Sequence, residues 1–190
     1  MEGLIEIPLS KAVYLISPRV TALVNTQDQN GNVNSAPYSF VHPLSIRHHL
    51  VGVVIGGKRK HTYINSKRTG EFVISIVSED FAQQAIDCEE AHELGESLLQ
   101  KHGLHTQASR KVKVPKVREA RACLECKVNQ FVELADDQLL MVGEVLYAEA
   151  EGSNGEIDLD AVKPLLHEAA GKFRSLGRSI TLRRGVQTTR

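Results

Sequence analysis

The stretch that decides the fold is RVTALVNTQDQNGNVNSAPYSF, residues 19–40. Residues 19–26 have the β-branched and apolar composition of a strand, and the Asn-Gly pair at 30–31 is a strong signal for a hairpin turn. Residues 33–40 form the returning strand. Pro37 has no N–H to donate, so it does not belong inside a central strand. We therefore expect a hairpin whose second strand leaves the sheet at Pro37.

The rest of the chain continues this β-rich pattern. The His-Pro pair at 42–43 is expected to end the returning strand, and LVGVVI at 50–55 is a short apolar strand. Strands come as sequence neighbours rather than in regular βαβ alternation, which favours a mainly β protein, an antiparallel barrel with peripheral helices. No linker or repeat divides residues 1–190, so we expect a single domain. Further strands are expected at 72–77, 122–133 and 139–149, and helices at 62–70 with Thr62 as cap, from Ser78 through Cys88, at 94–102 and at 160–170.

Composition sets limits on the partner and the compartment. Lys plus Arg and Asp plus Glu number 23 each, so bulk charge indicates no polyanionic partner. No apolar segment has the length of a membrane span, and the N-terminal MEGLIEIPL has no basic region of the kind that begins a signal peptide. Three cysteines are too few for a disulfide scaffold. We expect a cytoplasmic protein with no membrane contact.

Two short motifs have plainer explanations than their first appearance suggests. GVVIGGK at 52–58 matches the first seven positions of a phosphate-binding loop, but Arg59 stands where a Ser or Thr would hold magnesium. We therefore interpret the segment as a strand that ends in Gly-Gly. Cys123 and Cys126 form a lone C-x-x-C. In a strand these side chains point to opposite faces, so they share neither a zinc ion nor a disulfide.

The basic cluster KRKHT, residues 58–62, combines three cations, a histidine and a hydroxyl at the start of an expected helix. Helix N-termini present free N–H groups and the positive end of the helix dipole, which suits a phosphate. Arg59 and Lys60 would add charge-assisted hydrogen bonds. This segment alone is equally well explained as a solvated basic loop.

The segment NSAPYSF, residues 34–40, has the properties of a seat for a flat heteroaromatic ring. Such a ring needs an apolar wall, close approach to the backbone, and polar groups at its edge. Ser35, Ala36 and Ser39 permit close approach, and Pro37 reduces local flexibility. With residues 58–62 as a phosphate clamp, the two segments could serve both ends of one flavin mononucleotide (FMN). The plain structural alternative is an edge strand that contains a proline.

A resemblance gives these segments a common meaning. The ordered series RVTALVNTQD, GNVNSAPYSF, GKRKHTYIN and TGEFVISIV resembles the flavin reductase-like family of FMN-binding split barrels, especially its flavoredoxin-type members. The likeness continues through SRKVKVPKVREA, LECKV and VGEV to PLLHEAAGKFRSLG, and so covers nearly the whole chain. It implies a six-stranded antiparallel split barrel that binds FMN at the interface of a homodimer.

The resemblance also implies the site residues, position by position. The N-x-A-P-x-S segment seats the flavin ring and ribityl chain, and the K-x-T-x-x-N element holds the phosphate end. The late H-x-x-x-G-x-F element, residues 167–173, matches a region that can close over the site. His42 is a further candidate for lining the ring, and no catalytic acid or base is assigned. The cofactor-binding candidates are Asn34, Ser35, Ala36, Pro37, Tyr38, Ser39, Phe40, Arg59, Lys60, Thr62, Asn65, His167 and Phe173.

Three functions follow as hypotheses. The first is an NAD(P)H-dependent flavin reductase that passes electrons to a flavin or another acceptor, and the second is an FMN electron carrier that does not meet NAD(P)H but serves a redox partner protein. The third is a nucleic-acid-binding barrel, which is disfavoured because residues 106–121 contain no aromatic side chain for stacking on bases. The eight histidines form no convincing ligand set, so no metal is expected. The basic residues that the third hypothesis would use are Arg110, Lys111, Lys113, Lys116, Arg118, Arg183 and Arg184.

Overall fold

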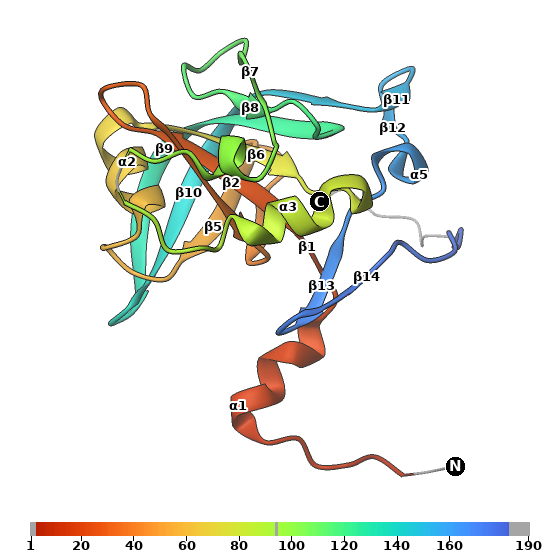
Figure 1. The fold of residues 1–190 in the computed structure, drawn as a ribbon. Helices are drawn as coiled ribbons and strands as arrows, with labels where there is room; N and C mark the ends of the chain where they lie inside the picture. Colours follow the sequence, from red (N-terminus) through yellow and green to blue (C-terminus); the bar gives the residue numbers. More distant parts are fainter. Residues whose placement is uncertain (1–2, 94, 183–190) are drawn as a thin grey trace.

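The structure is a computed structural model that describes residues 3–93 and 95–182. Its main element is a seven-stranded antiparallel sheet with the strand order β3-β2-β6-β9-β10-β5-β4 (Figure 1). The mainly β fold class is thereby confirmed, with one strand more than the resemblance implied. The strands are β2 (Ala22–Gln27), β3 (Val33–Tyr38), β4 (Val41–Ser45), β5 (Leu50–Ile55), β6 (Glu71–Ile76), β9 (Ala122–Ala135) and β10 (Gln138–Ala150).

The smaller elements surround this sheet. A three-stranded sheet with the order β1-β13-β14 lies beside it, and two short hairpins pair β7 with β8 and β11 with β12. The additional strands are β1 (Arg19–Val20), β7 (Thr106–Gln107), β8 (Lys116–Val117), β11 (Gly152–Ser153), β12 (Glu156–Ile157), β13 (Leu166–Ala169) and β14 (Lys172–Arg174). The helices are α1 (Leu9–Ala12), η1 (Val13–Ile16), α2 (His61–Thr69), η2 (Glu79–Phe81), α3 (Ala82–Asp87), α4 (Leu98–Lys101) and α5 (Leu159–Val162).

The two outer strands of the large sheet are consecutive in the sequence. Only two residues separate the end of β3 at Tyr38 from the start of β4 at Val41. In a flat seven-stranded sheet the outer strands would stand about 29 Å apart, at about 4.8 Å per neighbouring pair. The connection from Tyr38 to Val41 spans at most about 11 Å. The sheet must therefore curl until its edges meet, which produces a barrel that is split between β3 and β4.

Both edges of the split contain a proline, and here two expectations were wrong. The β3 strand does not leave the sheet at Pro37, because Pro37 is paired with Leu23 of β2 and the register continues to Tyr38. The His-Pro pair at 42–43 does not end the strand either, since Pro43 lies within β4, paired with Val51. An outer strand tolerates proline because its outward side has no neighbour that needs an N–H. Of the seven strands in the large sheet, β4 is the one that was not expected from the sequence.

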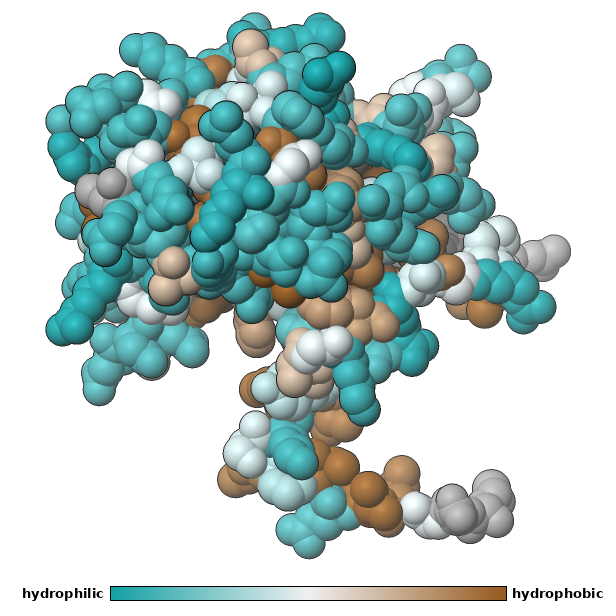
Figure 2. Space-filling model, viewed as in Figure 1, coloured by the Kyte–Doolittle hydropathy of each residue, from teal (hydrophilic) through white to brown (hydrophobic). Residues whose placement is uncertain are grey.

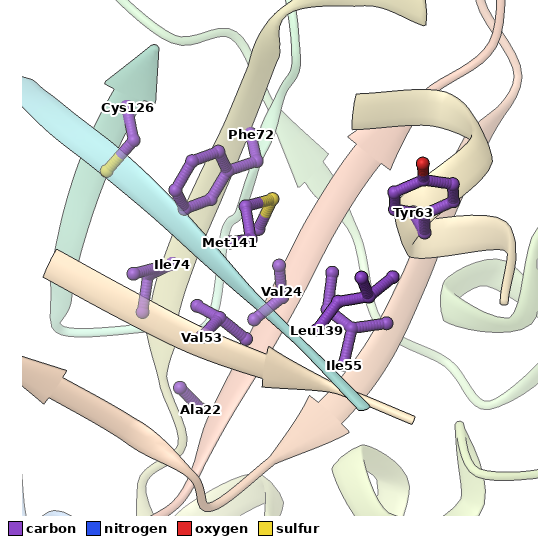
Figure 3. Packing of buried hydrophobic residues seen from close by; sticks show 10 residues of the cluster. All are labelled: Ala22, Val24, Val53, Ile55, Tyr63, Phe72, Ile74, Cys126, Leu139 and Met141. Atoms are coloured by element: carbon purple, nitrogen blue, oxygen red, sulfur yellow. The ribbon is translucent and has the colours of Figure 1, made fainter. Parts of the chain in front are cut away.

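The barrel interior is filled by buried apolar side chains from five of the seven strands, with Tyr63 of α2 closing one end (Figure 3). Phe72 occupies its centre with no exposed surface, and Gly143 on β10 makes room for it. A Cβ at Gly143 would lie 2.2 Å from Cζ of Phe72. A second core lies between β2 and the helices α3 and α4, and Leu23 of β2 belongs to it. Because both faces of β2 are covered, this strand has a continuous run of buried residues.

The helices differ from expectation at their ends. Helix α2 begins at His61 with Lys60 as N-cap and ends at Gly70 in the left-handed conformation, so Thr62 lies inside the first turn instead of capping it. The helix expected at 160–170 is only four residues long. Lys163 adopts a left-handed conformation and Pro164 follows it, so the chain turns and continues as β13. The N-terminal part of the helix expected at 94–102 lies partly outside the described residues, and α4 covers only Leu98–Lys101.

The N-terminal segment, residues 3–16, projects from the body as an arm (Figure 1). Neither α1 nor η1 contains a buried residue. Figure 2 shows apolar side chains gathered along this arm. Within the described ranges, no helix is long and apolar enough to cross a membrane.

Candidate functional site

Two cavities adjoin along β3, next to the split in the barrel. The first, here called the α2 cavity, has a volume of about 470 Å³ and opens at the N-terminus of α2. The second, the β13 cavity, has a volume of about 440 Å³ and reaches β13 and β14. Pro37, Tyr38 and Glu89 line both, so the cavities are adjacent, and the two together are called the groove below. Each volume lies within the range typical of small-molecule sites.

The α2 cavity is built to receive an anion. Lys60 is in an extended conformation at the N-cap, and no side chain of the described residues caps the first turn of α2. The free N–H groups and the positive end of the helix dipole therefore face the cavity. The exposed side chains of Arg59 and Lys60 line it as well. Thr62 is buried, and Asn34 of β3 places its Nδ2 3.3 Å from the Thr62 hydroxyl.

A histidine pair closes one side of the α2 cavity and was missed by the sequence reasoning. His92, on the loop after α3, has Nε2 3.2 Å from Nδ1 of His61 and 3.1 Å from Oδ1 of Asn34. Burial lowers the pKa of His61, and the nearby His92 lowers it further. Burial also raises the pKa of Tyr38, while the hydroxyl of Thr62 opposes that shift. The loop has no motif in the sequence, so only its proximity in space could identify His92.

The β13 cavity has aromatic walls. The ring of His167 stacks on Phe173 with a centroid separation of 4.8 Å and an interplanar angle of 30°. Nδ1 of His167 lies 2.8 Å from the hydroxyl of Ser39. Phe40 lines the cavity from the end of the β3–β4 connection, and Tyr14 reaches it from the arm. A flat ring could enter between these side chains.

Most of the predicted site residues are brought together in this groove, although three of them are not. Ser35 is buried and donates a hydrogen bond to Oδ1 of Asn25 at 2.6 Å, so its hydroxyl points away from both cavities. Asn65, on α2, is buried, with its Nδ2 3.5 Å from the hydroxyl of Thr26. His42 lies on β4 and lines neither cavity. The residues that line the groove are Asn34, Ala36, Pro37, Tyr38, Ser39, Phe40, Arg59, Lys60, Thr62, His167 and Phe173.

The other motifs have structural roles. Residues 50–55 form β5, which confirms their interpretation as a strand. Cys126 points into the barrel core, whereas Sγ of Cys123 lies 3.7 Å from the hydroxyl of Ser75. The expectation that the two thiols face opposite sides of the strand is therefore confirmed. In the described part of the chain, no three His, Cys, Asp or Glu side chains are arranged to hold a metal ion.

The basic segment after residue 106 is partly neutralised within the protein. Lys116 is buried and forms an ion pair with Glu149. The guanidinium of Arg110 lies over the ring of Tyr147, 5.0 Å from its centroid. Arg183 and Arg184 lie outside the described residues. Lys116 and Arg110 are therefore engaged within the protein, which reduces the positive charge that the nucleic-acid hypothesis requires.

Comparison with known proteins identifies the class to which this groove belongs. Residues 15–177 match the family model described as "Flavin reductase like domain". The uncharacterized protein BH2278 of Halalkalibacterium halodurans is 31% identical over 183 residues, which cover 89% of this chain and 87% of that protein. The chain therefore belongs to the flavin reductase-like family.

Two solved structures share the fold. The structure of nitrilotriacetate monooxygenase component B from Bacillus cereus has a TM-score of 0.84 at 25% identity, and the match covers 96% of this chain and 100% of that one. The flavoredoxin of Desulfovibrio vulgaris (Miyazaki F) has a TM-score of 0.82 at 19% identity, with 95% and 96% covered. The expected family and its split-barrel architecture are confirmed.

The thiols should be unreactive in the folded protein. Burial raises the pKa of Cys88 to about 11 and that of Cys126 to about 12, and it also raises the pKa of Cys123. With a pKa of about 11, about one thiol in a thousand is ionised at pH 8. Titration with Ellman's reagent at pH 8 should therefore modify almost no thiol in native protein, and all three after unfolding. Rapid reaction of the native protein would contradict this expectation.

Proposed function

We propose that this protein binds FMN in the groove, takes a hydride from NAD(P)H, and passes electrons to a flavin, quinone, iron centre or protein acceptor. The observation that carries the proposal is the arrangement of the groove. One end is an uncapped helix N-terminus with Arg59 and Lys60, and the other is an aromatic cavity between Phe40 and His167. FMN has the corresponding two ends, a phosphate and a flat ring.

The residues in the groove fit this cofactor. The free N–H groups of α2, with Arg59 and Lys60, would hold the phosphate by charge-assisted hydrogen bonds. Pro37 and Tyr38 lie where the two cavities meet, so they would border the ribityl chain. Thr21 is 2% exposed and lines the β13 cavity. Its hydroxyl has no hydrogen-bond partner among the described residues, which leaves it available to the polar edge of a ring. When bound, FMN supplies the redox chemistry, and the protein positions the ring and controls its access to solvent.

The function is tested by adding NADH or NADPH, without oxygen, to protein loaded with FMN. With at least one of the two donors, the absorption band of the oxidised flavin should disappear. This band is expected at about 450 nm, as in free FMN. An FMN-loaded protein that keeps its colour with both donors would contradict direct use of NAD(P)H. The second candidate, an electron carrier, would then be favoured, since the sequence has no G-x-G-x-x-G motif for a dinucleotide. A protein that binds no FMN would contradict both.

The phosphate assignment is tested by replacing Lys60 and Thr62 together with alanine. The change removes one charge and one hydroxyl from the α2 cavity, so the Kd for FMN should rise about 100-fold, or about 3 kcal/mol. Lys58→Ala is the matched control, because Lys58 belongs to the same basic cluster but forms an ion pair with Glu133 outside the cavity. Thr62→Ser, which keeps the hydroxyl, should retain most of the affinity. Equal affinity of the double variant and the native protein, by flavin fluorescence titration, would refute the assignment.

We further propose that the protein is a homodimer in which the arm of one copy packs on the second copy. We also propose that residues 1–190 act as one domain and that the protein is located in the reducing cytoplasm. Large apolar side chains on the arm are almost fully exposed in one copy, including Leu9 at 90% and Leu15 at 72%. Exposed apolar groups that lie close together mark interaction surfaces. Tyr14 connects the arm to the β13 cavity, so a partner that covered the arm would also border the site. The three free thiols suit a reducing compartment.

Light scattering after gel filtration tests the dimer. The native protein should have twice the mass of one chain, and Leu15→Asp combined with Ile16→Asp should shift it to the monomer, because buried carboxylates at the interface would lack partners. Ile157→Asp is the control, since Ile157 is 64% exposed but lies on β12, away from the arm. A monomeric native protein would refute the proposal.

A further inference from the structure

Arg19 is a buried cation without a carboxylate partner. It is 8% exposed, although charged side chains are rarely buried unless they are paired. Its Nη1 donates to the hydroxyl of Ser17 at 2.8 Å, and its Nη2 lies 3.5 Å from the carbonyl oxygen of Glu168. Over the described ranges, the ion pairs include none with Arg19, and its Nε–H has no hydrogen-bond partner. The positive charge of this guanidinium is therefore not neutralised by any carboxylate of residues 3–93 and 95–182.

The guanidinium lies directly behind two walls of the β13 cavity. Its central carbon is 4.8 Å from the centroid of the Phe40 ring, and Nη2 is 3.4 Å from Nδ1 of His167. The pairing of β1 with β13 places Arg19 opposite His167, and Figure 1 shows these strands side by side. Phe40 and His167 both line the cavity. The charge is thus separated from the cavity by a single layer of side chains.

The same contacts fix the orientation of the His167 ring. A guanidinium only donates hydrogen bonds, so Nδ1 of His167 acts as an acceptor, and its single lone pair is shared between Arg19 at 3.4 Å and the nearer hydroxyl of Ser39 at 2.8 Å. Nε2 lies 2.8 Å from the carbonyl oxygen of Ala170, which only accepts, so the ring proton belongs on Nε2. No carboxylate is needed to hold this arrangement.

Two carboxylates lie in the neighbourhood, but neither neutralises Arg19. The carboxylate of Glu168 pairs with Arg174 of β14, and Glu168 offers Arg19 only its backbone carbonyl. Glu89 lines the cavity, but it is exposed to solvent, where its charge is screened. The field at the β13 cavity is therefore expected to be positive on the Arg19 side.

We propose that Arg19 makes the β13 cavity bind reduced FMN more tightly than oxidised FMN. This inference rests on the proposed function. A hydride donor delivers two electrons and one proton to the ring and leaves in its oxidised form, so the ring gains one negative charge until it takes up a second proton. A buried cation near the ring stabilises that charge, and charge close to a flavin ring tunes its reduction potential. Arg19 does not line the cavity itself, so it is a positioning residue. It contacts Phe40 and His167, and its charge acts on the ring across the layer that these two side chains form.

The midpoint potential of bound FMN measures this preference without reference to turnover. Spectroelectrochemistry of the FMN-loaded native protein should give a potential above that of free FMN. Arg19→Gln removes the charge and should reduce the preference for reduced FMN about tenfold, which is about 30 mV for a two-electron couple. Arg19→Lys keeps the charge and should retain most of the preference. Lys172→Gln is the matched control, since Lys172 lies on the adjacent β14 but is exposed, and the potential of FMN bound to this variant should stay at the native value.

The outcomes separate this inference from the proposed function. Failure of the native protein to bind FMN refutes the proposed function, and the inference fails with it. Bound FMN with a potential at or below that of free FMN refutes the role of Arg19 alone and needs no variant. Equal potentials in native protein and Arg19→Gln, or equal losses in Arg19→Lys and Arg19→Gln, also refute a role for the charge. If Arg19→Gln does not fold, the native protein and Arg19→Lys still decide the question.

Discussion

The rest of the structure depends on the short connection between β3 and β4. Seven strands in a flat sheet would separate these two edges by far more than Ser39 and Phe40 can span, so the sheet has to curl. The curl creates an interior, which is filled around Phe72, and it brings two outer strands together without closing the ladder between them. The groove runs along one side of this split. The connection therefore determines both the core and the position of the site.

The site uses features that a regular sheet would exclude. Pro37 and Pro43 are tolerated because they lie on outer strands, and a proline at an edge also discourages another strand from pairing there. The edge of β3 therefore stays available to a ligand. Helix α2 contributes its uncapped N-terminus at one end of the groove, and the pairing of β13 with β1 brings His167 to the other. Side chains of α2 and β13, which are far apart in the sequence, thus meet along β3.

Local signals in the sequence predicted much of the fold and one end of the site. The Asn-Gly turn, the apolar strand at 50–55 and the left-handed Gly70 each follow from short-range chemistry, and the structure agrees with them. Features that depend on distant partners could not be read in this way. His167 was expected in a helix, because nothing nearby indicates that β1 is its partner. Likewise, the burial of Ser35 and the contact of His92 with Asn34 depend on the closed barrel.

The two ends of the groove use positive charge differently, and the difference follows from burial. Arg59 and Lys60 are exposed, so they keep their hydration and suit a group whose charge is permanent, such as a phosphate. Arg19 is buried among neutral partners, where the cost of desolvation is high and the field extends further. Such a charge acts most strongly on a group whose own charge changes during reaction. The overall net charge of zero therefore says little about the site, because the local positions of Arg59, Lys60 and Arg19 determine its electrostatics.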